Sequence, residues 1–138
     1  MFHRPLRACT AGLWLAGAAL AGGSAIPALS RLGIGQALVF TAVAVVAAVL
    51  SLAVLRAARW ALWVSTFALG GQVGAVLGTA SELAVGINPG KATQLRQLGV
   101  DPTAGVLINL AYSGLASLLF FWLSWRWLRH RANRLPRP

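Results

Sequence analysis

One carboxylate and one amide lie within a glycine-rich apolar stretch of the sequence, residues 69–86 (LGGQVGAVLGTASELAVG). The chain has only two acidic residues, and Glu82 is the one inside an apolar run. A carboxylate within a membrane span is a candidate for binding a proton, a cation or a substrate. Glu82 also lies about one turn from the end of its predicted span, within reach of Lys91 or Arg96 in the following loop. The sequence therefore leaves a functional and a structural role open for this residue.

Polar side chains deeper in the predicted spans offer a second candidate site. Gln72 lies about 18 Å along its helix from Trp60, near the bilayer centre. An unpaired amide in hydrocarbon costs a few kcal/mol, so Gln72 needs a hydrogen-bond partner, and Thr41 of the preceding span is suitable. The last span adds three further polar groups, Asn109, Tyr112 and Ser113. These residues either bond the helices to one another or line a route for an ion or a substrate.

The residue types that enzymes and metal sites require are scarce in the chain. His3, Cys9 and His130 are scattered over the terminal segments and do not form a metal-binding set. No nucleophile has base and acid partners, and none of the motifs that bind phosphate is present. We therefore expect no enzymatic activity, no metal and no cofactor.

The composition favours a membrane protein over a soluble domain. Of 138 residues, 58% are hydrophobic and 10% are charged, whereas soluble domains carry about 25% charged residues. A helix crosses the hydrocarbon in about 20 apolar residues. Four runs qualify, at about residues 8–29, 34–55, 60–86 and 102–125. We predict an all-α fold, an integral membrane four-helix bundle with up-down-up-down topology, as a single transmembrane domain over residues 1–138.

The basic residues predict how these spans are oriented. Nine of the twelve Lys and Arg residues lie on one side of a four-span arrangement, and only Arg31, Lys91 and Arg96 lie on the other. This positive-inside bias predicts that the N- and C-termini are cytoplasmic, in a bacterial cytoplasmic (inner) membrane. The basic tail, residues 126–138, and the tryptophans at the same side are expected to contact lipid headgroups. The residues concerned are Trp60, Trp125, Arg126, Arg129, Arg131 and Arg134.

The first span has an alternative interpretation as a cleaved signal peptide. MFHRPLR resembles a basic leading region, ACTAGLWLAGAALAGG an apolar core, and GGSAIPALS contains small residues suited to cleavage. Cleavage would leave three spans with the N-terminus outside. The apolar stretch continues to Leu29, which is long for a signal peptide and favours an uncleaved span.

The segments between the spans are short. Residues 56–59 are too few for anything but a tight antiparallel hairpin of the second and third spans. In the loop INPGKATQLRQLGVD, Asn88-Pro89-Gly90 predicts a turn. Ala92, Leu95 and Leu98 share one face of a short amphipathic helix that Gly99 ends, which we expect to lie on the outer membrane interface. Asp101-Pro102 predicts the start of the last span.

Small residues at helical spacing mark the faces through which spans pack, because helices in lipid associate by close packing and hydrogen bonds. The second span carries one such seam, Ala37, Thr41, Ala44, Ala48 and Ser51. The third span carries a glycine zipper that leads to Glu82, made of Gly70, Gly74 and Gly78. It also carries a second stripe spaced by seven, Ser65, Gln72 and Thr79. With packing surfaces on both flanks, the third span is predicted to be the centre of the bundle.

The last span has one face of small and polar residues, four apart, which we expect to pack on the glycine zipper if the zipper packs within the chain; the alternative is that the zipper packs between two copies of the chain. The members of this face of the last span are Gly105, Asn109, Ser113 and Ser117.

Two functional hypotheses follow. The first is a small non-enzymatic accessory or interaction subunit, which packs on another copy of itself or on another membrane protein through these seams. The second is a small oligomeric transporter or channel, linked to protons or cations, that uses Glu82 with Gln72 and Asn109 along the route. In both, the lipid bilayer is a partner and nucleic acid is not, because the basic residues flank apolar runs and form no polar stripe.

Overall fold

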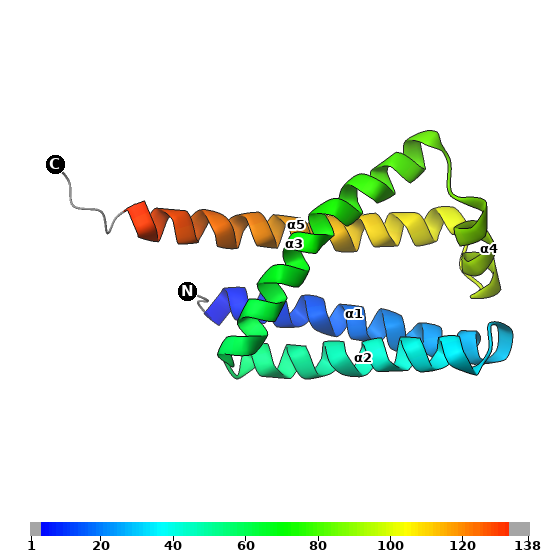
Figure 1. Cartoon of the computed structure of the whole chain (residues 1–138), viewed down its shortest axis with the longest axis horizontal. Coiled ribbons are helices and arrows are strands. Elements are labelled where there is room, and N and C mark those ends of the chain that lie inside the picture. Colours follow the sequence, from blue (N-terminus) through cyan, green and yellow to red (C-terminus); the bar gives the residue numbers. More distant parts are fainter. Residues whose placement is uncertain (1–3, 133–138) are drawn as a thin grey trace.

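The chain is all-helical in its computed structural model, which describes residues 4–132. The described part forms five helices: α1 (Arg4–Arg31), α2 (Ile34–Leu55), α3 (Arg59–Val85), α4 (Pro89–Gln97) and α5 (Pro102–Ala132). Four of them, α1, α2, α3 and α5, are long and apolar enough to cross a membrane. Along the chain these four alternate in direction, so that α1 begins near the end of the molecule where α5 finishes (Figure 1).

Local capping residues set the ends of α4 and α5. The Asn88 side chain accepts a hydrogen bond from the Gly90 N–H at 2.9 Å, and Pro89 takes the first position of α4. Asn88-Pro89-Gly90 therefore begins a helix and is not a separate turn. Gly99 has φ +78°, which favours glycine, and follows the end of α4. Asp101 accepts a hydrogen bond from the Ala104 N–H at 3.0 Å, as expected of a residue that caps α5.

The helices α1 and α2 form a closely packed antiparallel hairpin (Figure 1). Gly33, with φ +97°, makes the tight turn between them. Alanines are buried along both helices, and the Ser51 hydroxyl donates to the Ala11 carbonyl at 2.9 Å. Such small side chains allow two helix backbones to approach closely, which is the main source of attraction between helices in lipid.

The seam that α2 uses in this hairpin differs from the predicted one. Ala37 is buried and Ala44 and Ala48 are partly buried, but Thr41 is exposed and donates to the Ala37 carbonyl of its own helix. Ser51, the last residue of the predicted seam, is buried as well, and the other buried residues of α2 are Ala47, Leu50 and Val54. The contact face is rotated because the last turns of α2 pack on α1 and on the start of α3 together, in a cluster with Ala11 and Ala61.

The connection from α2 to α3 is as tight as predicted, but the two helices do not run side by side. Ala57 adopts φ +58°, and its N–H donates to the Val54 carbonyl, which ends α2. α3 then departs diagonally and crosses α5. The axes of α1, α2 and α5 lie nearly parallel in the view, although α1 runs opposite to the other two (Figure 1). The hairpin expected of α2 and α3 is therefore replaced by a crossed pair of α3 and α5.

A small apolar cluster joins α1, α3 and α5. It consists of Leu6, Leu69, Ala116 and Leu123. Nearby, the Tyr112 hydroxyl of α5 donates to the Leu13 carbonyl of α1 at 3.2 Å. This contact requires a glycine on α1, because a Cβ atom at Gly17 would lie 2.7 Å from the Tyr112 hydroxyl oxygen.

We predict that Gly17→Ala is less stable than Gly12→Ala by about 1–2 kcal/mol. Both changes remove a glycine from the interior of α1, and a methyl group at Gly12 meets nothing within 4 Å. At Gly17 the methyl displaces the Tyr112 ring and weakens its hydrogen bond. Thermal and denaturant unfolding in detergent micelles would measure the difference.

The Tyr112→Phe background supplies the control for this pair. It removes the hydroxyl and leaves the nearest ring carbon 3.4 Å from the new methyl, an ordinary contact. The two alanine variants should then have nearly equal stability. Equal stability with Tyr112 intact would contradict the close contact between α1 and α5.

Candidate functional site

The face of α3 that points into the molecule is the stripe spaced by seven residues. Ser65 and Thr79 are fully or almost fully buried, at 0% and 3% exposure, and Gln72 between them is partly buried. Seven residues are about two helical turns, so the three side chains project from the same side of α3. Leu69 and Ala61 of the same helix are also buried.

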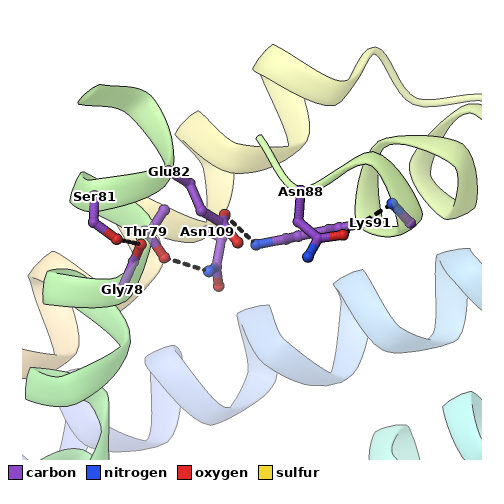
Figure 2. Close-up of polar contacts among 8 residues, drawn as sticks. Gly78, Thr79, Ser81, Glu82, Asn88, Lys91 and Asn109 are labelled. Carbon is purple, nitrogen blue, oxygen red and sulfur yellow. Dashed lines mark hydrogen bonds and ion pairs between the residues drawn. The ribbon is translucent and has the colours of Figure 1, made fainter. Parts of the chain in front are cut away.

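Two hydrogen bonds join this stripe to α5. The Ser113 hydroxyl donates to Gln72 Oε1, and Asn109 Nδ2 donates to Thr79 Oγ1, each at 2.9 Å. Figure 2 shows the second bond, with the side chains of Thr79 and Asn109 pointing toward each other. We call Gln72, Thr79, Asn109 and Ser113 the polar seam. Gln72 therefore bonds to α5 and not to Thr41, since α3 leaves α2 after its first turns and crosses α5 instead.

Two further hydrogen bonds attach α1 to the same assembly. The Trp14 indole N–H donates to the Ser65 hydroxyl at 2.8 Å, and Tyr112 donates to the Leu13 carbonyl. The bond from Trp14 was not predicted from the sequence. A signal was available: Trp14 lies within a span, away from the tryptophans of the basic side, and a buried indole N–H usually finds an acceptor.

Glu82 is neutralised by Lys91 of α4. The Lys91 ammonium lies 2.5 Å from Glu82 Oε2, and the two side chains are 36% and 23% exposed. Figure 2 shows the pair beside the bond between Thr79 and Asn109, at one end of the polar seam. This is the arrangement that the structural interpretation of Glu82 requires. Arg96, the other cation considered for this role, is exposed.

The glycine zipper of α3 has a different environment from the polar seam. Only Gly70 faces a neighbouring helix, since a Cβ atom there would lie 3.3 Å from the Phe120 ring. A Cβ atom at Gly71, Gly74 or Gly78 would meet nothing within 4 Å. The small and polar face of α5 thus packs on the stripe spaced by seven, and not on the zipper as expected.

Gly105, at the start of the same α5 face, packs against α4. A Cβ atom at Gly105 would lie 2.9 Å from the nearest methyl carbon of Leu95. The Arg31 guanidinium of α1 also donates to the Gln97 carbonyl near the end of α4, at 3.1 Å. Together with the ion pair of Lys91, these contacts attach α4 to three of the long helices.

The residues expected to contact lipid headgroups lie near the ends of α3 and α5. Trp60 and Trp125 are 55% and 56% exposed. The Arg129 guanidinium carbon lies 5.1 Å from the centre of the Trp125 ring, in a cation–π contact, and Arg126 is partly buried. The Arg131 side chain and Arg134 lie outside the described part of the chain.

The polar seam supplies hydroxyl and amide groups that bond to each other across two helices. Within residues 4–132, no group of three His, Cys, Asp or Glu side chains is placed to hold a metal ion. The chemistry that these groups perform in this arrangement is hydrogen bonding between helices.

Comparison with known proteins gives no further assignment, because no family model, no curated protein and no solved structure matches the chain.

We predict a measurable coupling between Thr79 and Asn109. In a double-mutant cycle of Thr79→Val and Asn109→Leu, the interaction energy should be about 0.6 kcal/mol and at most about 1.7 kcal/mol, the range found for hydrogen bonds between membrane helices. Unfolding in detergent micelles gives the four stabilities.

Thr41 supplies the matched control for this cycle. It is exposed and its hydroxyl bonds within its own helix, so Thr41→Val should show no coupling with Asn109→Leu. A coupling of the same size for Thr41, or none for Thr79, would contradict the arrangement of the polar seam.

Proposed function

We propose that this chain is a non-enzymatic accessory subunit of the bacterial cytoplasmic membrane that assembles through the glycine face of α3. The observation that carries the proposal is the open position of Gly71, Gly74 and Gly78, where added Cβ atoms would meet no neighbour within 4 Å. The intrachain contacts of α3 use the polar seam, which leaves the glycine face available to a second copy of the chain or to another membrane protein.

The four-residue spacing of the open glycines of α3 supports this interpretation; Gly12, Gly23, Gly35 and Gly114 also face open space but do not repeat this spacing. Glycine in a helix interior costs about 1 kcal/mol relative to alanine, so its presence favours positions where a side chain would obstruct packing. Gly17, Gly70 and Gly105 each lie against a side chain of another helix. Gly74 and Gly78 repeat the four-residue spacing that lets membrane helices approach closely, with no such neighbour in the chain.

The proposed orientation places the start of α1 and the end of α5, which lie at the same end of the molecule in Figure 1, on the cytoplasmic side. Seven of the nine arginines within residues 4–132 support it, because they lie at that end and basic residues are enriched in cytoplasmic segments. α4 then lies at the outer interface. Its Lys91 neutralises Glu82 close to the level where charges are tolerated.

We predict that Gly78→Leu abolishes assembly without lowering the stability of the monomer. The larger side chain separates the helices that meet at the glycine face, while inside the chain it occupies open space. Assembly is measured by cross-linking the purified protein in mild detergent and by the amount of any protein that copurifies with it. Unfolding of the detergent-solubilised monomer measures stability.

Gly23→Leu is the matched control, because Gly23 is an exposed helical glycine of α1 that also faces open space. It should leave assembly unchanged. If the wild-type protein is a lone monomer at all concentrations, or if both variants lose assembly equally, the proposal fails.

A second candidate function is a proton- or cation-linked transporter that uses Glu82. The observation in its favour is the position of Glu82 beside the Thr79–Asn109 bond, which places a carboxylate at one end of the polar seam (Figure 2). A transporter of this kind would lose coupled flux in Glu82→Gln while its assembly survived.

We expect the accessory subunit to give the opposite result in this experiment. Glu82→Gln should leave proton-linked flux in proteoliposomes equal to that of the wild type, because the Glu82 charge serves only to hold Lys91. The same variant should be less stable, because Lys91 loses its partner. Loss of flux with assembly and stability retained would favour the transporter over the accessory subunit.

A further inference from the structure

An apolar groove of about 630 Å³ lies between α1 and α5, apart from the polar seam and the glycine face. Small residues of α1, among them Gly12 and Ala16, form one wall, and Leu118 and Trp122 of α5 belong to the other. The lining residues span about 10 Å along each helix, from the helical rise of 1.5 Å per residue. The groove is thus an open-sided apolar depression, about 10 Å long, on the surface of the long helices.

Beyond the groove, the same face of α5 carries two arginines. Arg126 follows Trp122 by one turn, and Arg129 follows it by two, so both lie on the stripe of α5 that lines the groove. The cation–π contact with Trp125 holds the Arg129 guanidinium on this helix. The planar guanidinium group matches the geometry of phosphate oxygens, and tryptophan is enriched at the level of lipid headgroups.

The charges at this end of the molecule have no counterpart within the described residues. The acidic residues Glu82 and Asp101 lie at the opposite ends of α3 and α5, where Glu82 pairs with Lys91 and Asp101 caps α5. The Nε atom of Arg7, at the same end as Arg126, is buried and makes no hydrogen bond with the described part of the chain. The anions that balance these arginines must therefore come from outside the chain.

We propose that an anionic phospholipid binds between α1 and α5, with one acyl chain in the groove and its phosphate against Arg126 and Arg129. The apolar groove suits an acyl chain, and the two arginines one and two turns beyond Trp122 on the same face of α5 suit a phosphate group. The groove suits a transmembrane helix of another protein less well. Such a helix is about 10 Å wide and about 30 Å long, so the groove would accommodate only about a third of its length. This site is independent of the glycine face and goes beyond the proposed function.

The experiment compares the retention of phosphatidylglycerol with that of phosphatidylethanolamine by native mass spectrometry of the full chain in mild detergent. We expect the wild-type protein to retain one phosphatidylglycerol in preference to phosphatidylethanolamine. Each arginine near an anionic lipid surface contributes about fivefold, so Arg126→Gln/Arg129→Gln should reduce the preference by about 25-fold. The matched control is Arg56→Gln/Arg59→Gln, which removes two charges from the same end but away from the groove and should retain the preference.

A second pair of variants tests the acyl chain. Gly12→Phe fills the groove from α1 and should abolish retention, whereas Gly23→Phe places the same side chain in open space outside the groove and should preserve it. If Gly12→Phe fails to fold, a bulky maleimide on Cys9, the single cysteine of the chain, fills the groove after folding. An unlabelled Cys9→Ser protein is then the reference.

Four results would overturn the site. Equal retention of the two lipids by the wild-type protein would exclude a phosphate site. Equal losses in the two arginine pairs would assign the preference to general surface charge. Retention of the lipid that persists when the groove is filled would exclude the acyl chain from the groove. A wild-type dimer without lipid that dissociates when the groove is filled would also exclude it, and would assign the groove to a second copy of the chain.

Discussion

Polar side chains within the long helices must find hydrogen-bond partners inside the protein, because hydrocarbon offers none. Within the described residues, seven side chains of the long helices bond to a carbonyl of their own helix, and five bonds join two long helices, of which α1 takes part in three. Ala11 accepts from α2, Trp14 donates to α3, and Leu13 accepts from α5. These three positions span four residues, about one helical turn, so α2, α3 and α5 are all attached at nearly the same level of α1. α1 thus bonds to each of the other three long helices, whereas α3 and α5 each bond to two of them.

This arrangement explains why α3 carries two kinds of small residue on two faces. Its polar stripe bonds to α5 and α1, and the distances of 2.8–2.9 Å require that the helices cross closely there. Its glycines do not contribute to those bonds, and Gly74 and Gly78 face away from the rest of the chain. Hydrogen bonds therefore specify the contacts of α3 within the chain, whereas the glycine face is able to bind a partner only through close packing. A face that binds only through close packing suits a contact between separately folded chains, because the polar groups of their helices already have hydrogen-bond partners.

The sequence predicts the elements of this fold better than their packing. The bounds of α2 agree with the predicted span, and Asp101 and Gly99 lie at the expected helix ends. The crossing of α3 over α5 was not predicted, because helices in lipid lack the hydrophobic contrast that tells a buried face from an exposed one. The predicted partner of Gln72 was Thr41 of α2, whereas its amide oxygen accepts from Ser113 of α5. The choice depends on the direction in which α3 leaves the tight turn at Ala57, which periodicity does not encode.

The contacts around Glu82 determine whether its carboxylate is able to bind and release ions. A carboxylate that carries an ion must exchange its partner during each cycle, so Lys91 would have to leave. Lys91 belongs to α4, which is also attached to α1 through Arg31 and to α5 through the packing of Leu95 on Gly105. Release of Glu82 would thus disturb contacts with three long helices at once. A carboxylate tied into so many contacts is better suited to fixing α4 in place than to exchanging ions.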